Sequence, residues 1–172
     1  MTLYFNADEV FEIAERIEDN GAAYYRAAAE LMDGPVRALL KELACWEKKH
    51  KAIFSELRIK LEAKERESTA FDPYHEAVQY LHALADDKVF ARNENPVTEL
   101  GAHPTSGDIL RGALNREYDS ITFYAGMKEV VAVRFGREHI EDIIREEMRH
   151  VTLLKRELGG ENDLGGMITT AG

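Results

Sequence analysis

The sequence predicts an all-α protein: a four-helix bundle of two antiparallel helix pairs, joined by a long crossover that carries an extra short helix. Three observations support this fold class. Along four long segments, apolar residues recur at steps of three and four, the spacing of one face of an α-helix. The breaks inside each pair are short, whereas residues 65–105 separate the pairs. No segment shows the alternation of apolar and polar residues that is typical of a half-buried strand.

The first helix pair is predicted over residues 6–32 and 35–64. Asn6 and Glu9 match the start of a helix, as an N-cap residue and its capping-box partner. Asp33-Gly34-Pro35 then ends the first helix and begins the second, because proline is favoured in a first helical turn. A break this short makes the two helices antiparallel neighbours.

The second helix pair follows the crossover at residues 65–105. A shorter helix is predicted inside the crossover, over residues 73–92, and a loop containing two prolines and a glycine follows it. The third long helix is predicted over residues 106–134 and the fourth over residues 137–158, with Gly136 in the tight turn between them.

Length and composition restrict the class of protein. The 172 residues correspond to one domain, which we place at residues 1–158, and the five glycines of residues 159–172 predict a flexible tail. The net charge of -10 argues against a nucleic-acid partner. No apolar segment is long enough to span a membrane, and the N-terminus lacks the pattern of a signal peptide, so we expect a cytoplasmic protein. The single cysteine, Cys45, excludes an internal disulfide and is expected to be a buried, small apolar side chain.

Each of the four apolar stripes contains an acidic residue where a hydrophobic residue is expected. Burying a lone carboxylate costs several kcal/mol by typical values, so four of them together require compensation. Protonation could neutralise some of these groups, and cations could neutralise all of them. The inward-facing acidic residues, with the histidines that share their stripes, are Glu18, Glu47, His50, Glu117, Glu147 and His150.

The spacing of these residues favours a metal site. The second and fourth helices each carry a glutamate and a histidine three residues apart, which places both side chains on one helix face. The first and third helices each carry a glutamate followed seven residues later by a tyrosine, Tyr25 or Tyr124. Either tyrosine could act beside the carboxylates or simply fill the core. Two copies of this pattern bring four carboxylates and two imidazoles together, as in di-iron and di-manganese carboxylate bundles.

The motifs also resemble a known family. The segments EDNGAAYY at 18–25, EKKH at 47–50, Glu117 with FY at 123–124, and EMRH at 147–150 are similar to the rubrerythrin branch of the ferritin-like di-iron carboxylate proteins. This resemblance implies a ferritin-like four-helix bundle that binds two iron ions, with manganese as the alternative metal.

The resemblance further implies a role for each residue. It assigns Glu47 and Glu147 as bridges between the two metals. The other ligands would complete one metal each: Glu18 with His50, and Glu117 with His150. Tyr25 and Tyr124 would donate hydrogen bonds to the ligand carboxylates.

The sequence departs from the family pattern at two points. A full rubrerythrin carries a rubredoxin-type domain that holds an iron with four cysteines, and a chain with one cysteine cannot form it. Many rubrerythrins also place an additional glutamate one turn after the third-helix ligand, where this chain has Ser120. The second difference implies a more symmetric site.

These observations favour a non-haem di-iron oxidoreductase that oxidises Fe(II) while reducing hydrogen peroxide or O₂, in defence against oxidative stress. Its partners would be the oxidant and an electron donor such as a rubredoxin-like protein, and we expect a homodimer or small homo-oligomer. Two alternatives remain open. One is a ferroxidase or iron-handling protein that feeds an iron store. The other is a non-catalytic helical interaction module that binds no metal.

Overall fold

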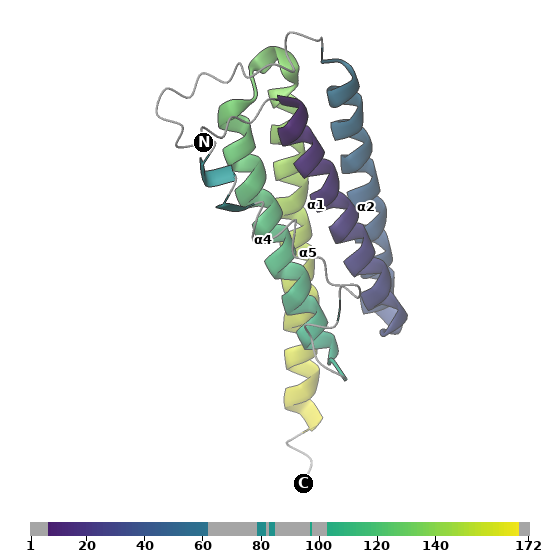
Figure 1. Cartoon of the computed structure of the whole chain (residues 1–172). Helices are drawn as coiled ribbons and strands as arrows, with labels where there is room; N and C mark the ends of the chain where they lie inside the picture. The colour runs from purple at the N-terminus through teal and green to yellow at the C-terminus, as the bar shows by residue number, and fades with distance from the viewer. Residues whose placement is uncertain (1–6, 62–78, 82, 85–96, 98–102, 169–172) are drawn as a thin grey trace.

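The computed structural model describes residues 7–61, 79–81, 83–84, 97 and 103–168. Four long helices lie side by side (Figure 1): α1 (Ala7–Glu30), α2 (Gly34–Ile59), α4 (Ser106–Val130) and α5 (Arg137–Ile168). A short 3-10 helix, η3 (Val133–Phe135), lies between α4 and α5. α1 packs mainly on α2, and α4 mainly on α5. The all-α four-helix bundle predicted from the sequence is therefore confirmed.

Local sequence signals account for the helix boundaries. Asp33 has an extended backbone at the N-cap of α2, and a proline follows in the first turn. Gly34 has a positive φ of 57°, a conformation that glycine adopts without steric cost. At the start of α4, Thr105 and Asp108 form a capping box in which each side chain bonds the backbone of the other residue.

The second pair differs from the prediction at both of its C-terminal ends. α4 ends at Val130 rather than at residue 134, and Arg137 Nε donates a hydrogen bond to the Val131 carbonyl, 2.9 Å away. Gly136 occupies the predicted turn with a φ of 94°. α5 continues to Ile168, so the predicted helix end at residue 158 is wrong. The glycines after that point lower helix propensity, but extending an existing helix needs no new nucleation.

Several predictions lie largely outside the described residues. Asn6, the predicted N-cap of the first helix, is one of them, and most of the predicted crossover helix at 73–92 is another. Residues 79–81 and 83–84 of that segment are helical, and Leu81 is completely buried against the bundle. Within the described part of the chain, no helix has the length and apolar character needed to cross a membrane.

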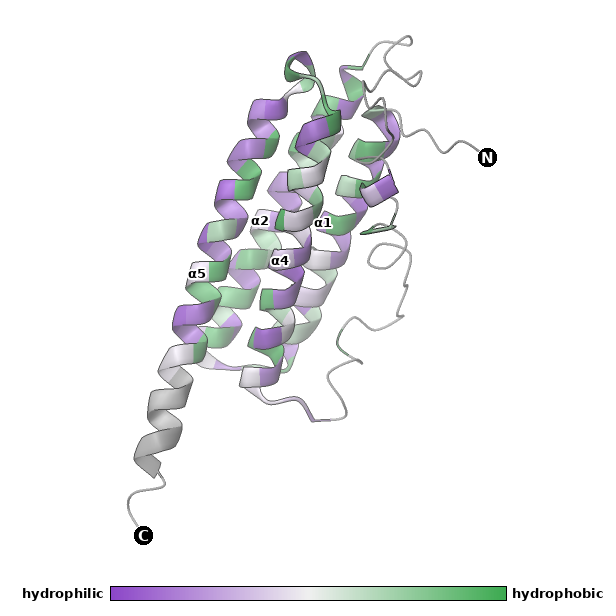
Figure 2. Cartoon of the chain, turned by 90° about the vertical axis from the view of Figure 1, so that its left-hand side faces the viewer, coloured by the Kyte–Doolittle hydropathy of each residue, from purple (hydrophilic) through white to green (hydrophobic). Residues whose placement is uncertain are grey.

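The core consists of two apolar clusters. One contains Phe11, Phe54 and Ile140, and the other contains Leu40, Leu110 and Leu154. Figure 2 shows hydrophilic residues on the outer side of α5 and apolar residues toward its neighbours, the distribution of an amphipathic helix. Each of the four long helices contributes residues to both clusters.

Candidate metal centre

The six side chains singled out from the apolar stripes are buried inside the bundle, each at most 4% exposed. One glutamate comes from α1, one from α4, and a glutamate with a histidine from each of α2 and α5. Carboxylates are almost never buried so completely unless they are paired or bind a metal. The full set is Glu18, Glu47, His50, Glu117, Glu147 and His150.

The structure brings these side chains together as two overlapping groups. Glu18 and His50 belong to one group, and Glu117 and His150 belong to the other. Glu47 and Glu147 belong to both. Within each group, the candidate ligand atoms all lie within 4.8 Å of one another. We call the first pair the His50 half and the second pair the His150 half of the centre.

Both imidazoles direct Nδ1 into the cluster. His50 Nδ1 lies 3.0 Å from Glu147 Oε1 and 3.6 Å from Glu18 Oε2. His150 Nδ1 lies 2.8 Å from Glu147 Oε2 and 3.6 Å from Glu117 Oε2. Glu147 therefore lies between the two histidines, and Nδ1 is the nitrogen of each ring that faces the carboxylates.

The two tyrosines are completely buried and reach across the bundle. Tyr25 of α1 donates a hydrogen bond from its hydroxyl to Glu117 of α4. Tyr124 of α4 donates in the same way to Glu18 of α1. Each phenol thus contacts the glutamate of the opposite helix pair. This arrangement fixes one oxygen of each carboxylate and leaves the other directed into the cluster.

Burial and mutual repulsion favour protonated carboxyl groups in the cluster when no cation is present. Burial raises the pKa of Glu18 and of Glu47 well above the ordinary value, and it raises that of Glu117 to about 8. Glu147 is the exception. Burial acts to raise its pKa, but hydrogen bonds from His150 and then His50 keep the pKa well below the ordinary value. Glu147 is the residue best placed to stay ionised.

The histidines show the complementary effect. Burial alone would lower the pKa of each imidazole, because it disfavours the charged form. Hydrogen bonding to Glu147 outweighs burial at His50 and raises its pKa to about 9. Hydrogen bonding to Glu117 and Glu147 raises the pKa of His150 to about 10. In the absence of cations, protons supply the positive charge that this cluster needs.

Unpaired buried atoms show that the cluster fits a metal. Among the described residues, Glu18 Oε2, His50 Nδ1, Glu117 Oε2 and Glu147 Oε1 are buried without a hydrogen bond of good geometry. Leaving such groups unsatisfied costs about 1–3 kcal/mol each by typical values. All four atoms are oxygen or imidazole nitrogen donors, the ligands that divalent iron and manganese accept. Divalent cations would satisfy these atoms together.

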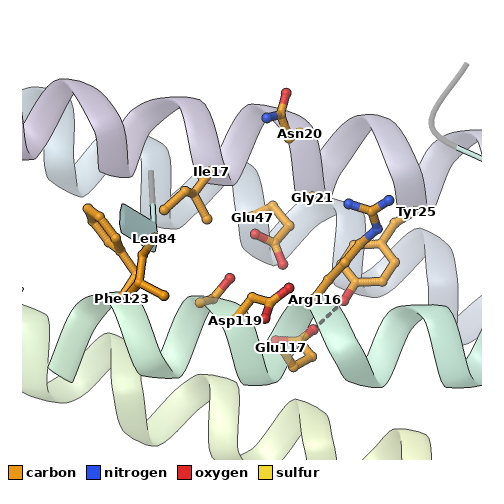
Figure 3. A pocket seen from close by; sticks show the side chains of 11 residues that line it. Ile17, Asn20, Gly21, Tyr25, Glu47, Leu84, Arg116, Glu117, Asp119 and Phe123 are labelled. Atoms are coloured by element: carbon orange, nitrogen blue, oxygen red, sulfur yellow. Dashed lines mark hydrogen bonds between the residues drawn. The ribbon is translucent and has the colours of Figure 1, made fainter. Parts of the chain in front are cut away.

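A small cavity of about 60 Å³ adjoins the cluster between α1 and α4 (Figure 3). Glu47 and Glu117 are directed into it, and Asn20, Arg116 and Asp119 line its polar side. This volume suits small molecules such as water, O₂ or hydrogen peroxide. The cavity gives such molecules a place beside the carboxylates.

Gly21 gives Glu47 the room that it needs. A Cβ atom at Gly21 would lie only 2.9 Å from Glu47 Oε2 and 3.0 Å from its Cδ. Glu47 of α2 therefore passes against the backbone of α1, and a larger residue at position 21 would displace its carboxylate.

Sequence reasoning missed two neighbours of the histidines. Glu146 Oε2 lies 2.8 Å from His50 Nε2, on the side of the ring away from the cluster. The ring of Trp46 lies 6.3 Å from that of His50 and 6.0 Å from that of His150, centroid to centroid. The only sequence signal was position, since each residue directly precedes a cluster glutamate. The expectation that Cys45 is buried was wrong, because it is exposed.

Comparison with known proteins agrees with this geometry. The family model described as Rubrerythrin matches residues 9–158. A solved structure from Thermotoga maritima, described as a ferritin-like diiron-carboxylate protein, superposes with a TM-score of 0.68 at 23% identity. The match covers 91% of this chain and 96% of that protein, and at this identity it shows the fold. Among curated proteins no match is found.

Proposed function

The chain belongs to the rubrerythrin family, and from this premise we propose that it is a di-iron oxidoreductase, which oxidises Fe(II) while reducing hydrogen peroxide or O₂. The observation that carries the proposal is the cluster of four carboxylates and two imidazoles at the centre of the bundle. A helical interaction module has no use for such a cluster, because burying the acids lowers stability unless a cation compensates them.

The two overlapping groups support a specific set of ligands. Glu47 and Glu147 are the residues common to both groups, which supports the proposal that they would be shared by two ions. The His50 half and the His150 half would each complete one ion. Four ionised carboxylates balance the charge of two divalent ions, which removes the electrostatic penalty of burial. Two bound Fe(II) ions would supply the two electrons that reduce one molecule of H₂O₂, with two protons, to two molecules of water.

The remaining residues of the site orient the ligands and control access. Tyr25 and Tyr124 hold the terminal carboxylates by hydrogen bonds. Burial and the neighbouring carboxylates raise the pKa of both phenols well above the ordinary value, so each stays a hydrogen-bond donor at neutral pH. The cavity beside Glu47 and Glu117 admits a small oxidant, and its size excludes large organic substrates.

An external electron donor must complete a catalytic cycle of this kind. These 172 residues contain a single cysteine, so they do not themselves form a four-cysteine iron site. We therefore propose a separate redox protein, such as a rubredoxin-like donor, as the partner that returns electrons to the centre. We also propose that the chain acts as a homodimer or small homo-oligomer.

The test combines metal content with oxidation kinetics. The protein is loaded anaerobically with Fe(II), its iron is counted by elemental analysis, and it is then mixed with H₂O₂ or with O₂ in a stopped-flow instrument. We expect about two irons per chain. The bound Fe(II) should be oxidised in a single turnover, at a rate with H₂O₂ that is at least equal to the rate with O₂. A chain that binds no iron would refute the proposal. Faster oxidation by O₂, with further Fe(II) consumed in excess of two per chain, would favour an iron-storage role instead.

A matched variant pair controls for unspecific iron. Glu42 is an exposed acidic residue of the same helix as Glu47. Glu42→Ala should retain both irons, whereas Glu47→Ala should lose them, although each change removes one carboxylate. Equal iron content in the two variants would mean that the iron is bound elsewhere.

A further inference from the structure

The two halves of the centre differ at the residue that precedes each bridging-helix glutamate. The chain repeats the pattern of a glutamate with a histidine three residues later, once in α2 and once in α5. The residue before that glutamate is Trp46 in α2 but Glu146 in α5. Because the helices face each other, Glu146 contacts His50, and Trp46 lies against the ring of His150.

Glu146 links the buried ring of His50 to the protein surface. Its Oε2 lies 2.8 Å from Nε2 of His50, while Nδ1 of the same ring faces Glu147 and Glu18. The Glu146 side chain is 29% exposed, whereas that of His50 is completely buried. Glu146 is therefore positioned to accept a hydrogen bond from Nε2, which would leave Nδ1 of the same ring to act as the ligand.

In the described part of the chain, His150 has no comparable carboxylate. Among the described residues, the structure shows no hydrogen bond to its Nε2, and its ring lies beside the indole of Trp46 instead. Lys49 Nζ lies 3.8 Å from the centre of that indole ring. Trp46 lies beside both rings, so the difference between the two halves is the carboxylate of Glu146 at Nε2 of His50.

We propose that Glu146 is a positioning residue that makes the His50 half of the centre bind its metal more tightly than the His150 half. A carboxylate that accepts a hydrogen bond from the outer nitrogen of a histidine fixes the tautomer and makes the inner nitrogen a better ligand. The inference rests on the proposed metal-binding function. It contradicts the symmetric site that the sequence implied, because the two halves load in order: the His50 half first and the His150 half second.

The chain offers a built-in reporter for this experiment. Trp46 is the single tryptophan, and its ring lies about equally close to both imidazoles. Co(II), a paramagnetic probe, would quench its fluorescence on binding to either half. Titration of the metal-free protein with Co(II) therefore measures two stepwise affinities, and elemental analysis of the product checks the stoichiometry.

Three variants separate the effect of the hydrogen bond from that of charge. Glu146→Ala removes both, Glu146→Gln keeps a hydrogen-bond acceptor without the charge, and Glu42→Ala removes an exposed carboxylate elsewhere. In the wild type we expect two resolved steps. Glu146→Ala should weaken the tighter step by about 10–100-fold and leave the weaker step unchanged. Glu146→Gln should recover part of this loss, and Glu42→Ala should show none.

Each result decides between the proposals. If Glu146→Ala leaves both steps unchanged, or weakens both equally, the positioning role is wrong although the metal-binding function stands. A single unresolved step in the wild type would also contradict the inference. If the wild type binds no Co(II), both the inference and the proposed function fail. A second check compares the protein with and without Glu146→Ala in a His50→Ala background. Removing Glu146 should then have no effect on the affinity for the metal that still binds.

Discussion

Replacing Gly21 with alanine would add one methyl group directly against the carboxylate of Glu47. The new Cβ would lie 2.9 Å from Oε2 and 3.0 Å from Cδ of that side chain. Favourable nonbonded contacts lie at about 3.5–4.0 Å, so the carboxylate must move by roughly half an ångström or more. In the metal-free protein this movement should cost little, because the contact is with the far end of a flexible side chain.

The cost should appear when the metals are bound, because Glu47 is then required at one position. Overpacking of this kind typically costs about 1–3 kcal/mol, which corresponds to a roughly 5- to 150-fold loss of affinity. The metal-free protein should behave differently. Alanine has a helix propensity up to about 1 kcal/mol better than glycine, which offsets the steric contact. The free energy of unfolding without metal should therefore change little.

Two measurements test this separation, and a second glycine provides the control. Trp46 fluorescence during Co(II) titration gives the affinity, and urea unfolding in the presence of a chelator gives the stability. Gly160 is also helical, but an added Cβ there would meet no atom within 4 Å. Gly160→Ala should keep the wild-type affinity. If Gly21→Ala binds Co(II) as tightly as this control, Glu47 is not held against α1 in the loaded protein and the reasoning fails.

Three further changes test the electrostatics of the centre. Glu47→Ala should leave the chelator-treated protein as stable as the wild type or more stable in urea, because a buried acid is lost; a clear loss of stability would contradict this. Tyr25→Phe leaves a buried oxygen of Glu117 without its donor, and it should lower the stability of the Co(II)-loaded protein by about 1–3 kcal/mol; an unchanged melting temperature would argue against the bond. Neighbouring carboxylates raise the pKa of His50 to about 9 and that of His150 to about 10. The native metal-free protein therefore keeps protons that the unfolded chain releases near pH 6.5, and its free energy of unfolding should fall as the pH rises from there toward 10. Thermal melts that show constant or rising stability over this range would refute that assignment.

The fold could be predicted because each bundle helix follows one periodic pattern and the breaks are marked by turn residues. Asp33-Gly34-Pro35 is an example, since the N-cap and the early proline occur where the sequence places them. The end of α5 could not be predicted in this way. Glycines are unfavourable in helices by about 1 kcal/mol each, but that cost does not end a helix that packing has already nucleated.

The cluster residues could be singled out because they interrupt apolar stripes, which makes a buried charge visible in the sequence. Glu146 carries no such signal. It is one more acidic residue in the charged segment REEMRH of α5. Only the packing of α5 beside α2 brings it into contact with His50. Gly21 was likewise ordinary in the sequence, because its importance depends on a side chain from another helix. Cys45 was expected inside on composition alone, yet its helix turns it outward.

Protons and metal ions compete for the same side chains in this bundle, so pH should act in opposite directions on its two states. Without metal, protonated carboxyl groups and imidazolium rings balance the cluster, and Glu147 carries the charge that the histidines stabilise. Binding of the two proposed divalent ions would require both Nδ1 atoms and all four carboxylates to be free of protons. A rise in pH therefore weakens the metal-free fold and strengthens metal binding. The two apolar clusters of the core contain none of these titrating side chains, so we expect the bundle to stay folded when protons are exchanged for metals.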